Sequence, residues 1–389
     1  MLTRVHFKNW RSLHDVVLDD LGLITVLIGA NSSGKTNIVE GFEFLRRIVT
    51  ARTAEAAWYK AQRDFVRTLG SSSHEDLEFE VETKPDVNSE SVVYRLRLDE
   101  QEPIFWESVF KAGTKIAEDY NLARVREPSL FVNRPETLML PIWAQTGGNI
   151  SGGNQDELHD LWTFIADRWQ ILDVSRIEPF HRFAPESNDV FLLEKDAQNL
   201  PSLLEFMADR YKEASQEFRA DVRWLLNHVD SVDPERFDRQ LRVAVTERYK
   251  LWESAPPYVP PTMSLGTARI VALLAAYHAL DMRAPQEPGL IIVDEPDASL
   301  NPGILGKLVE LLRSYTSREG RPRQFILTTH NPAFLNYFTP DEVRIVSRDA
   351  QGHTHVERVP ESVRKIWLED GTYALGEVWD MGAFGVPAE

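Results

Sequence analysis

The sequence predicts an α/β fold built around a largely parallel sheet, and two patterns carry this prediction. Toward the C-terminus, apolar runs of strand length alternate with stretches of helical spacing. Near the N-terminus, an apolar run over 23–28 leads into a glycine-rich turn and a helical stretch. Because strands that alternate with helices pair in parallel, both ends of the chain are expected to build one core. The expected C-terminal elements are helices over 266–282 and 303–315 and strands over 290–293, 324–328 and 343–346.

The middle of the chain follows other patterns. Residues 77–98 alternate apolar and polar side chains, which predicts antiparallel hairpins, whereas 111–155 looks irregular because glycine pairs interrupt it. Over 201–229 apolar residues recur every three or four positions, which predicts one helix about 40 Å long. The predicted parts are an N-terminal lobe with the glycine-rich turn and the hairpins (1–110), an inserted helical and irregular lobe (111–259), and a C-terminal lobe (260–389).

Composition limits the classes of function. The chain has 389 residues with 43% hydrophobic and 26% charged side chains, which is ordinary for a globular protein. It contains no cysteine, so disulfides and thiolate metal sites are excluded. No apolar run approaches the length of a membrane-spanning helix, and the alternating N-terminus lacks an apolar signal core. We therefore expect a cytoplasmic protein that does not enter a membrane.

The formal net charge of −17 argues against a surface that binds nucleic acid over its whole extent. A local basic strip stays open, because arginines recur at alternate positions of the predicted hairpins and again over 236–248. Solvated arginines on exposed faces are the simpler interpretation of these positions. Nucleic acid is therefore a possible partner that composition alone does not show.

The strongest motif is a glycine-rich turn between the first apolar strand and the first helix. It reads Gly29-Ala30-Asn31-Ser32-Ser33-Gly34-Lys35-Thr36 and is followed by Asn37 at the start of the helix. Glycines let the backbone N–H groups of such a turn point at phosphates, and the helix N-terminus adds its dipole. Lys35 would neutralise the β- and γ-phosphates, and the Thr36 hydroxyl would bind Mg²⁺. These residues predict a P-loop that binds ATP.

A second motif places two carboxylates at the end of a buried strand. The apolar run 290–293 is followed by Asp294 and Glu295. Carboxylates at the end of an apolar strand are costly unless they face a cation or a reacting water. In P-loop enzymes the first such carboxylate holds Mg²⁺ and a neighbouring group orients the attacking water. We assign these two roles to Asp294 and Glu295.

Two further positions complete the predicted site. His330 ends the strand that follows the Asp294 strand after one helix, and a right-handed crossover would place the two strands side by side. His330 would then face the γ-phosphate or its attacking water from the carboxyl edge of the sheet. Upstream of both strands, Ser264 and Gly266 lie at the start of the predicted helix over 266–282 and form another anion site. Since the P-loop already serves one ATP, this second site suggests the ATP of a partner subunit.

These elements together resemble the ABC ATPase superfamily: P-loop, signature, Walker B and histidine switch, in that order. The details resemble the RecF, Rad50, SMC and overcoming-lysogenization-defect branch, and looser pieces resemble the small bacterial ATPases of the AAA_21 type. The similar segments are Asn9-Trp10-Arg11-Ser12, the Asn31 form of the P-loop, Met263-Ser264-Leu265-Gly266-Thr267, Asp294-Glu295-Pro296-Asp297-Ala298-Ser299-Leu300-Asn301-Pro302 and Thr329-His330-Asn331-Pro332. Trp10, Met263 and Asn301 depart from the usual residues of the branch.

The resemblance implies an ABC ATPase head that binds ATP and Mg²⁺, with Arg11 among the nucleotide contacts. It also implies a homodimer that closes head-to-tail on two ATPs and switches a separate effector protein, such as a nuclease or toxin, in phage defence or DNA repair. The alternative is the ATP-binding subunit of a membrane transporter. No acidic constellation for a nuclease follows His330. Gln62 is the candidate for the glutamine loop, and the transporter-like segment Ile150-Ser151-Gly152-Gly153-Asn154-Gln155 is interpreted as a plain glycine loop.

Overall fold

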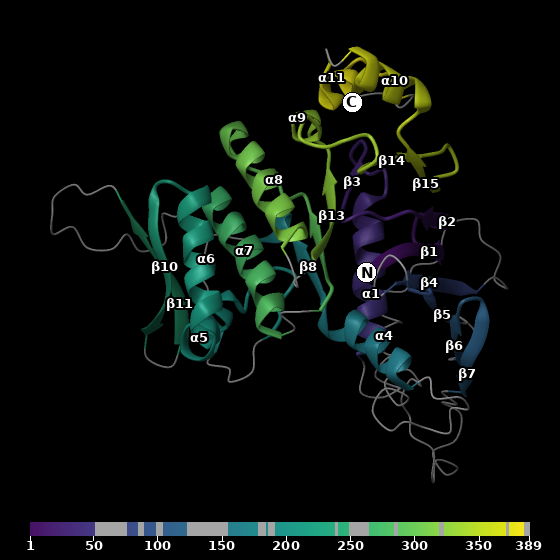
Figure 1. The fold of residues 1–389 in the computed structure, drawn as a ribbon, viewed down its shortest axis with the longest axis horizontal. Coiled ribbons are helices and arrows are strands. Elements are labelled where there is room, and N and C mark those ends of the chain that lie inside the picture. The colour runs from purple at the N-terminus through teal and green to yellow at the C-terminus, as the bar shows by residue number, and fades with distance from the viewer. Residues whose placement is uncertain are drawn as a thin grey trace, which may run out of the picture. The chain divides into compact units, whose positions relative to one another are not determined.

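A computed structural model describes most of the chain, which forms two compact units (Figure 1). Unit 1 consists of Met1–Trp169, Pro340–Glu369 and Met381–Glu389, and unit 2 of Gln170–Thr339 and Asp370–Asp380. The described residues are 1–50, 76–84, 89–98, 104–122, 155–177, 184–185, 191–237, 240–248, 264–283, 287–318, 323–370 and 373–384. Within these ranges, no helix is long and apolar enough to cross a membrane.

Unit 1 contains a six-stranded antiparallel sheet in the order β2-β1-β4-β5-β6-β7. The hairpin predicted over 77–98 is confirmed, but the irregular stretch expected from residue 111 is wrong as far as residue 122. Ala112 and Gly113 both have positive φ, 47° and 79°, and such a pair makes the tight turn of a hairpin. The strands are β1 (Leu2–Trp10), β2 (Leu13–Leu18), β4 (Leu77–Thr83), β5 (Val92–Leu98), β6 (Ile104–Lys111) and β7 (Thr114–Leu122).

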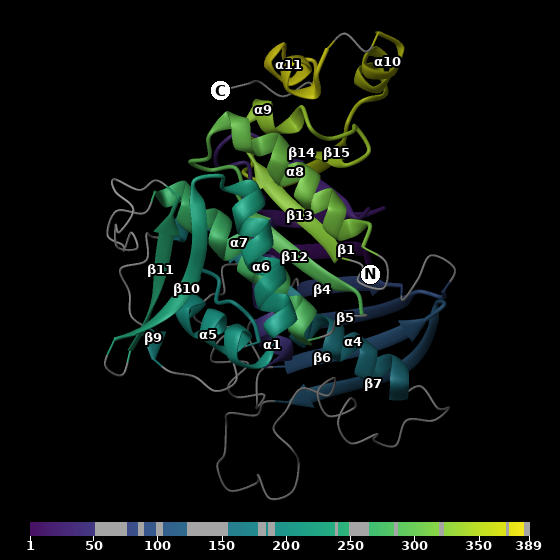
Figure 2. The same ribbon diagram turned by 60° about the vertical axis from the view of Figure 1, so that its left-hand side comes forward.

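Unit 1 also holds the strand and helix that flank the glycine-rich turn. β3 (Ile24–Ile28) pairs in parallel with β14 (Val343–Arg348), and β15 (Thr354–Arg358) pairs antiparallel with β14. The helix α1 (Lys35–Val49) packs beside α4 (Gln155–Asp167), and Figure 2 shows the two helices next to the antiparallel sheet. Helix α10 (Glu361–Asp370) follows β15. Phe7 of β1 packs edge-on against Phe42 of α1 at 5.3 Å between ring centroids, which anchors the helix to the antiparallel sheet.

Unit 2 contains the parallel pair that the sequence predicted. β12 (Gly289–Asp294) pairs in parallel with β13 (Arg323–Thr329), and β8 (Trp169–Asp173) lies beside β12 in the strand order. All residues of β12 and β13 are buried, as expected for strands covered on both faces. A short 3₁₀ turn (Val174–Arg176) follows β8. The helices of this part are α7 (Leu265–Arg283), α8 (Pro302–Thr316), α9 (Pro332–Leu335) and α11 (Leu375–Asp380).

The single long helix predicted over 201–229 is wrong, because the chain forms two helices there. They are α5 (Leu200–Arg210) and α6 (Lys212–Leu225). Tyr211 leaves the helical conformation, with φ −127° and ψ 63°, and its ring packs 5.5 Å from that of Phe206. The apolar spacing continues across this break, so periodicity could not reveal it. From Val229 onward the chain is β10 (Val229–Phe237), which pairs with β11 (Gln240–Glu247), and β11 pairs with β9 (Ala184–Pro185).

Candidate active site

At two positions of the glycine-rich turn in unit 1, the backbone accommodates only glycine. Gly34 begins α1 with φ 111°, a left-handed conformation that residues with a Cβ rarely adopt. A Cβ added at Gly29 would lie 2.1 Å from the carbonyl oxygen of Val346 on β14. The turn therefore sits tightly against the strand beside it, and its shape depends on both glycines.

The Lys35 side chain folds back onto the turn and contacts its backbone. Its Nζ donates hydrogen bonds to the carbonyl oxygens of Gly29 and Ala30 at 2.7 and 2.8 Å. The side chain is only 6% exposed. The ammonium group is thus positioned at the turn by carbonyl acceptors, while Asn31, Ser32 and Thr36 are exposed on it.

A network of hydroxyl groups supports the turn from β15 and from the start of β2. The Thr354 hydroxyl donates to the carbonyl oxygen of Ser33 at 2.9 Å and lies 2.7 Å from the Ser12 hydroxyl. Asn37, the third residue of α1, donates from its amide to the same Ser12 oxygen at 2.6 Å. Sequence reasoning missed Thr354, because it lies more than 300 positions from the motif and no local pattern marks it.

Arg11, which was predicted to contact the nucleotide, has two side-chain contacts in this part of unit 1. It forms an ion pair with Glu40 of α1 and lies over the ring of Trp10, whose centroid is 5.0 Å away. Trp10 in turn donates from its indole nitrogen to the carbonyl oxygen of Asn37 at 3.0 Å. The Asn9–Ser12 segment therefore packs against α1, and the guanidinium of Arg11 is directed at Glu40.

In unit 2, one threonine of the neighbouring strand contacts both Asp294, at the end of β12, and the backbone of Glu295. The Thr328 hydroxyl donates to the Asp294 carboxylate and accepts a 3.0 Å hydrogen bond from the backbone N–H of Glu295. Asp294 is 5% exposed, whereas Glu295 is half-buried and has a positive φ of 54°. The chain thus turns sharply after Asp294, and the hydroxyl fixes the turn. Thr328 was not predicted; a hydroxyl residue at the end of an apolar strand, two positions before His330, was its only signal.

His330 and Glu295 are brought together as neighbours across the parallel strand pair. The His330 Nδ1 atom lies 3.0 Å from the Glu295 Oε1 atom. The predicted adjacency of the two strands is confirmed, since β12 and β13 pair in parallel from Gly289↔Arg323 to Val293↔Leu327. A carboxylate held by an imidazole at the open edge of a parallel sheet can orient a water and accept its proton.

The segment after Glu295 is tied to the His330 strand by a buried acid. The Asp297 carboxylate accepts a 3.0 Å hydrogen bond from the Thr329 hydroxyl. Burial raises the pKa of Asp297, while the Thr329 hydroxyl and its other donors oppose this rise. Asn301, where the resembling branch commonly has histidine, serves as the N-cap of α8 by accepting from the Gly303 N–H at 2.9 Å.

The predicted signature segment begins α7 and packs on the loop after Glu295. The Ser264 hydroxyl accepts a 3.1 Å hydrogen bond from the Thr267 N–H and so caps the helix. A Cβ added at Gly266 would lie 2.9 Å from the Ser299 carbonyl oxygen. Arg269, one turn further, donates to the Ser299 hydroxyl at 2.8 Å. Burial lowers the pKa of Arg269, and the nearby carboxylates of Glu295 and Asp173 counter this. Met263 and Gln62 lie outside the described residues.

A P-loop in unit 1, and strand-end carboxylates with a histidine in unit 2, are motifs of an ABC-type ATPase. The chain belongs to the AAA_21 family, described as "AAA domain, putative AbiEii toxin, Type IV TA system", whose model matches residues 24–336. No curated protein matches the chain in sequence.

Solved structures give the same fold. The chain is similar to an SMC head bound to the C-winged helix domain of ScpA, with a TM-score of 0.55 and 16% identity, over 94% of this chain and 99% of that one. It is also similar to an SMC head with an extended coiled coil, bound to the C-terminal domain of ScpA derived from Pyrococcus furiosus. There the TM-score is 0.54 and the identity 14%, over 96% and 99% of the two chains. The α/β ABC head fold with added antiparallel sheets is confirmed.

Proposed function

We propose that this protein hydrolyses ATP with Mg²⁺, and that ATP-dependent pairing of two copies switches a separate partner. The observation that carries the proposal is the arrangement at the end of β12, where Thr328 bonds both Asp294 and Glu295 and His330 contacts Glu295. Burying a carboxylate costs free energy, so a strand end without a function is not expected to hold a buried carboxylate, a half-buried one and an imidazole together. The family membership supports nucleotide hydrolysis as the chemistry.

In this proposal the P-loop and the carboxylates act on one ATP. The backbone N–H groups of the turn and the Lys35 ammonium bind the phosphates. The exposed Thr36 hydroxyl and the Asp294 carboxylate are oxygen donors of the kind that suit Mg²⁺, which when bound neutralises charge on the phosphates. Glu295 accepts the proton of the attacking water, and His330 holds that carboxylate in place.

The proposed partner interactions rest on the signature segment. Ser264 is exposed at the start of α7, so its helix N-terminus is available to the ATP of a second copy. Two copies would close head-to-tail on two ATPs, and the energy of ATP binding would shift an equilibrium between open and closed pairs. A separate effector, such as a nuclease or toxin, would respond to that change in bacterial phage defence or DNA repair. The SMC heads of similar fold are bound to a partner in their structures, which supports a partner-switching function.

Transport is the other function that the motifs allow. The AAA_21 match and the likeness to SMC heads do not favour the ATP-binding subunit of a membrane transporter. We therefore propose that the protein works away from the membrane, in the cytoplasm. Purification of the native complex would identify the partner, and a membrane protein recovered in equal amount would support transport instead.

The proposal is tested by two substitutions that separate binding from hydrolysis. Lys35→Ala removes the charge that binds the phosphates and is expected to abolish ATP binding in calorimetry. Glu295→Gln keeps the metal site but loses the base, so binding should persist while turnover falls by about 10²- to 10³-fold. Turnover at the wild-type rate in Glu295→Gln would show that this residue is not the base.

The effector is proposed to be a different protein, and this part has its own test. The chain alone, incubated with single- and double-stranded DNA and RNA, ATP and Mg²⁺ or Mn²⁺, should leave the nucleic acid intact. Cleavage that survives purification and disappears in a variant outside the ATP site would contradict a separate effector.

A further inference from the structure

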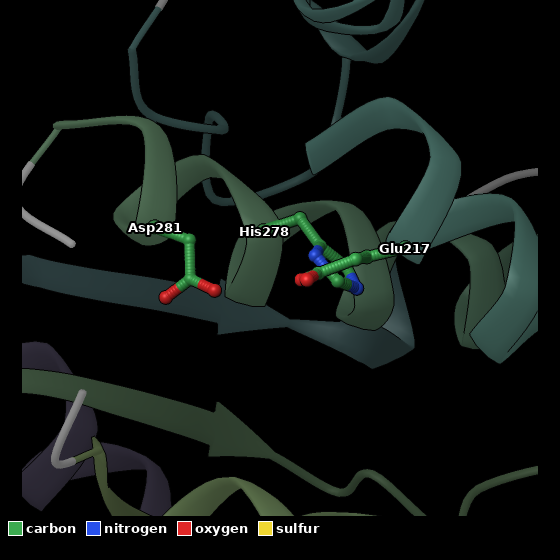
Figure 3. A group of neighbouring side chains, drawn as sticks. All are labelled: Glu217, His278 and Asp281. Carbon is green, nitrogen blue, oxygen red and sulfur yellow. The ribbon is translucent and has the colours of Figure 1, made fainter. Parts of the chain in front are cut away.

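A cluster of ionisable side chains lies between two helices of unit 2 and has no part in the proposed ATP chemistry. Glu217 and Asp221 are four positions apart on α6, and His278 and Asp281 are three apart on α7, so each pair lies on one helix face. The two helices pack against each other. One ligand atom each from Glu217, His278 and Asp281 lies within 4.8 Å of the other two. Figure 3 shows Glu217 reaching toward the His278 ring, with Asp281 further along the same helix as His278.

His278 is fully buried, and the partner of one ring nitrogen determines the state of the other. Its Nε2 atom lies 2.8 Å from the Asp221 carboxylate, which also accepts the Tyr315 hydroxyl at 2.5 Å. A neutral imidazole that donates from Nε2 carries a lone pair on Nδ1. This Nδ1 atom has no hydrogen-bond partner within the described part of the chain. In metal sites, the ring nitrogen of a histidine ligand that does not bind the metal commonly donates to a carboxylate, which orients the ring.

Arginines balance part of the charge of the cluster. Arg323 pairs with Asp281 at 2.6 Å, and Arg318 pairs with Glu217 at 3.0 Å and lies 3.6 Å from Asp281. These ion pairs and the His278–Asp221 contact join three carboxylates to two guanidinium groups, which leaves one negative charge while His278 is neutral. The Asp281 Oδ1 atom pairs with Arg323 and its Oδ2 atom faces Arg318, so a metal ion would displace Arg318 from Asp281 and Glu217. The Arg318 side chain is 34% exposed and can move, whereas Arg323 is fully buried.

We infer that Glu217, His278 and Asp281 bind a divalent transition-metal ion, with Zn²⁺ as the first ion to test. One imidazole and two carboxylates suit Zn²⁺, whereas Mg²⁺ prefers oxygen ligands alone. Tetrahedral binding at about 2.1 Å brings ligand atoms to about 3.4 Å from one another, so small side-chain rotations must close the 4.8 Å cluster. Three protein ligands leave a fourth position for water. The ion would join α6 to α7, the helix that begins at the signature segment.

The inference is tested on full-length, tag-free protein without nucleotide. Calorimetry with Zn²⁺ and visible absorption with Co²⁺ should show about one tightly bound ion per chain, with the absorption bands of a nitrogen-containing site. His278→Gln should weaken binding by at least about 10- to 100-fold. His159→Gln, which changes an exposed histidine of α4, is the matched control and should bind as wild type. Zn²⁺ should also raise the Tm of the wild type and of this control, but not that of His278→Gln.

Arg318→Met provides a second variant whose effect runs in the opposite direction. It removes the movable cation that competes for Glu217 and keeps most of the side-chain volume, so Zn²⁺ should bind several-fold more tightly. A structural ion-pair network without a metal predicts no such gain. Equal Zn²⁺ affinity in the wild type and His278→Gln would overturn the inference. So would nuclear magnetic resonance spectra of His278 with both ring nitrogens protonated and unchanged by Zn²⁺.

Discussion

The P-loop of unit 1 and the end of β12 in unit 2 are held in shape by different means. In the P-loop of unit 1, the shape is set by backbone positions that have no room for a side chain, such as Gly29 against Val346. At the end of β12 in unit 2, the shape is set by side-chain hydrogen bonds, with Thr328 at their centre. The P-loop should therefore be sensitive to added volume, and the end of β12 to the loss of single polar atoms.

The largest expected effect comes from added volume in the P-loop. Gly29→Ala places a Cβ 2.1 Å from the Val346 carbonyl oxygen, a distance that forces the turn away from β14. ATP affinity measured by calorimetry should fall by at least about 100-fold, because a displaced turn cannot aim its N–H groups at the phosphates. Gly22→Ala is the control, since the nearest atom to its Cβ would be 3.7 Å away. Wild-type ATP affinity in Gly29→Ala would show that the turn has room for a side chain at this position.

A mixture of two inactive variants tests whether the signature segment of one copy completes the ATP site at the P-loop of another. Lys35→Ala and Gly266→Asp should each be inactive alone. Mixed in equal amounts, they should recover roughly a quarter of wild-type turnover, because half of the random dimers are mixed and each has one intact site. A mixture without activity at any ratio would argue for a site that is complete within one chain.

A second variant of the signature segment distinguishes loss of the shared site from a folding defect. Because a Cβ at Gly266 would lie 2.9 Å from the Ser299 carbonyl oxygen, Gly266→Asp itself strains the loop after Glu295. Ser264→Arg adds bulk at an exposed position and should complement Lys35→Ala in the same proportion. Circular dichroism of each variant would confirm that it is folded.

A smaller effect should follow the loss of one hydroxyl in unit 2. Thr328→Val keeps the volume but leaves the Glu295 N–H without its acceptor and Asp294 without its donor. Loss of these contacts lets the Asp294 and Glu295 carboxylates shift from their positions, so turnover should fall by roughly 10- to 100-fold while ATP binding changes little. Thr25→Val, at a buried position of the P-loop strand, is the matched control. Equal losses of turnover in both variants would contradict the special role of the Thr328 hydroxyl.

The smallest predicted effect concerns the buried acid beside the His330 strand. Burial raises the pKa of Asp297, so the folded state holds its proton to a higher pH than the unfolded state does. The stability associated with this proton is present below the ordinary pKa of an aspartate and is lost as pH rises through the raised value. Asp297→Asn should therefore raise the free energy of unfolding at pH 8, and raise it by less at pH 4. Denaturant unfolding at both pH values would measure this, and a pH-independent difference would contradict it.

The sequence alone was sufficient wherever a motif is contiguous or a strand is uniformly apolar. The P-loop sits between β3 and α1 as expected, and Asp294 and His330 follow paired parallel strands. Local chemistry explains this success, since glycine conformation, apolar runs and strand–helix alternation are all encoded in neighbouring residues. The allocation of 1–110, 111–259 and 260–389 to lobes stays a prediction.

Tertiary structure decided the features that depend on residues far apart in the chain. The break at Tyr211 follows from its packing with Phe206, which helical periodicity does not register. Thr354 reaches the P-loop from a strand more than 300 residues away, and Thr328 bridges two strands. A hydrogen bond across such separations depends on where the folded backbone brings two atoms, and no local pattern in the sequence records that distance.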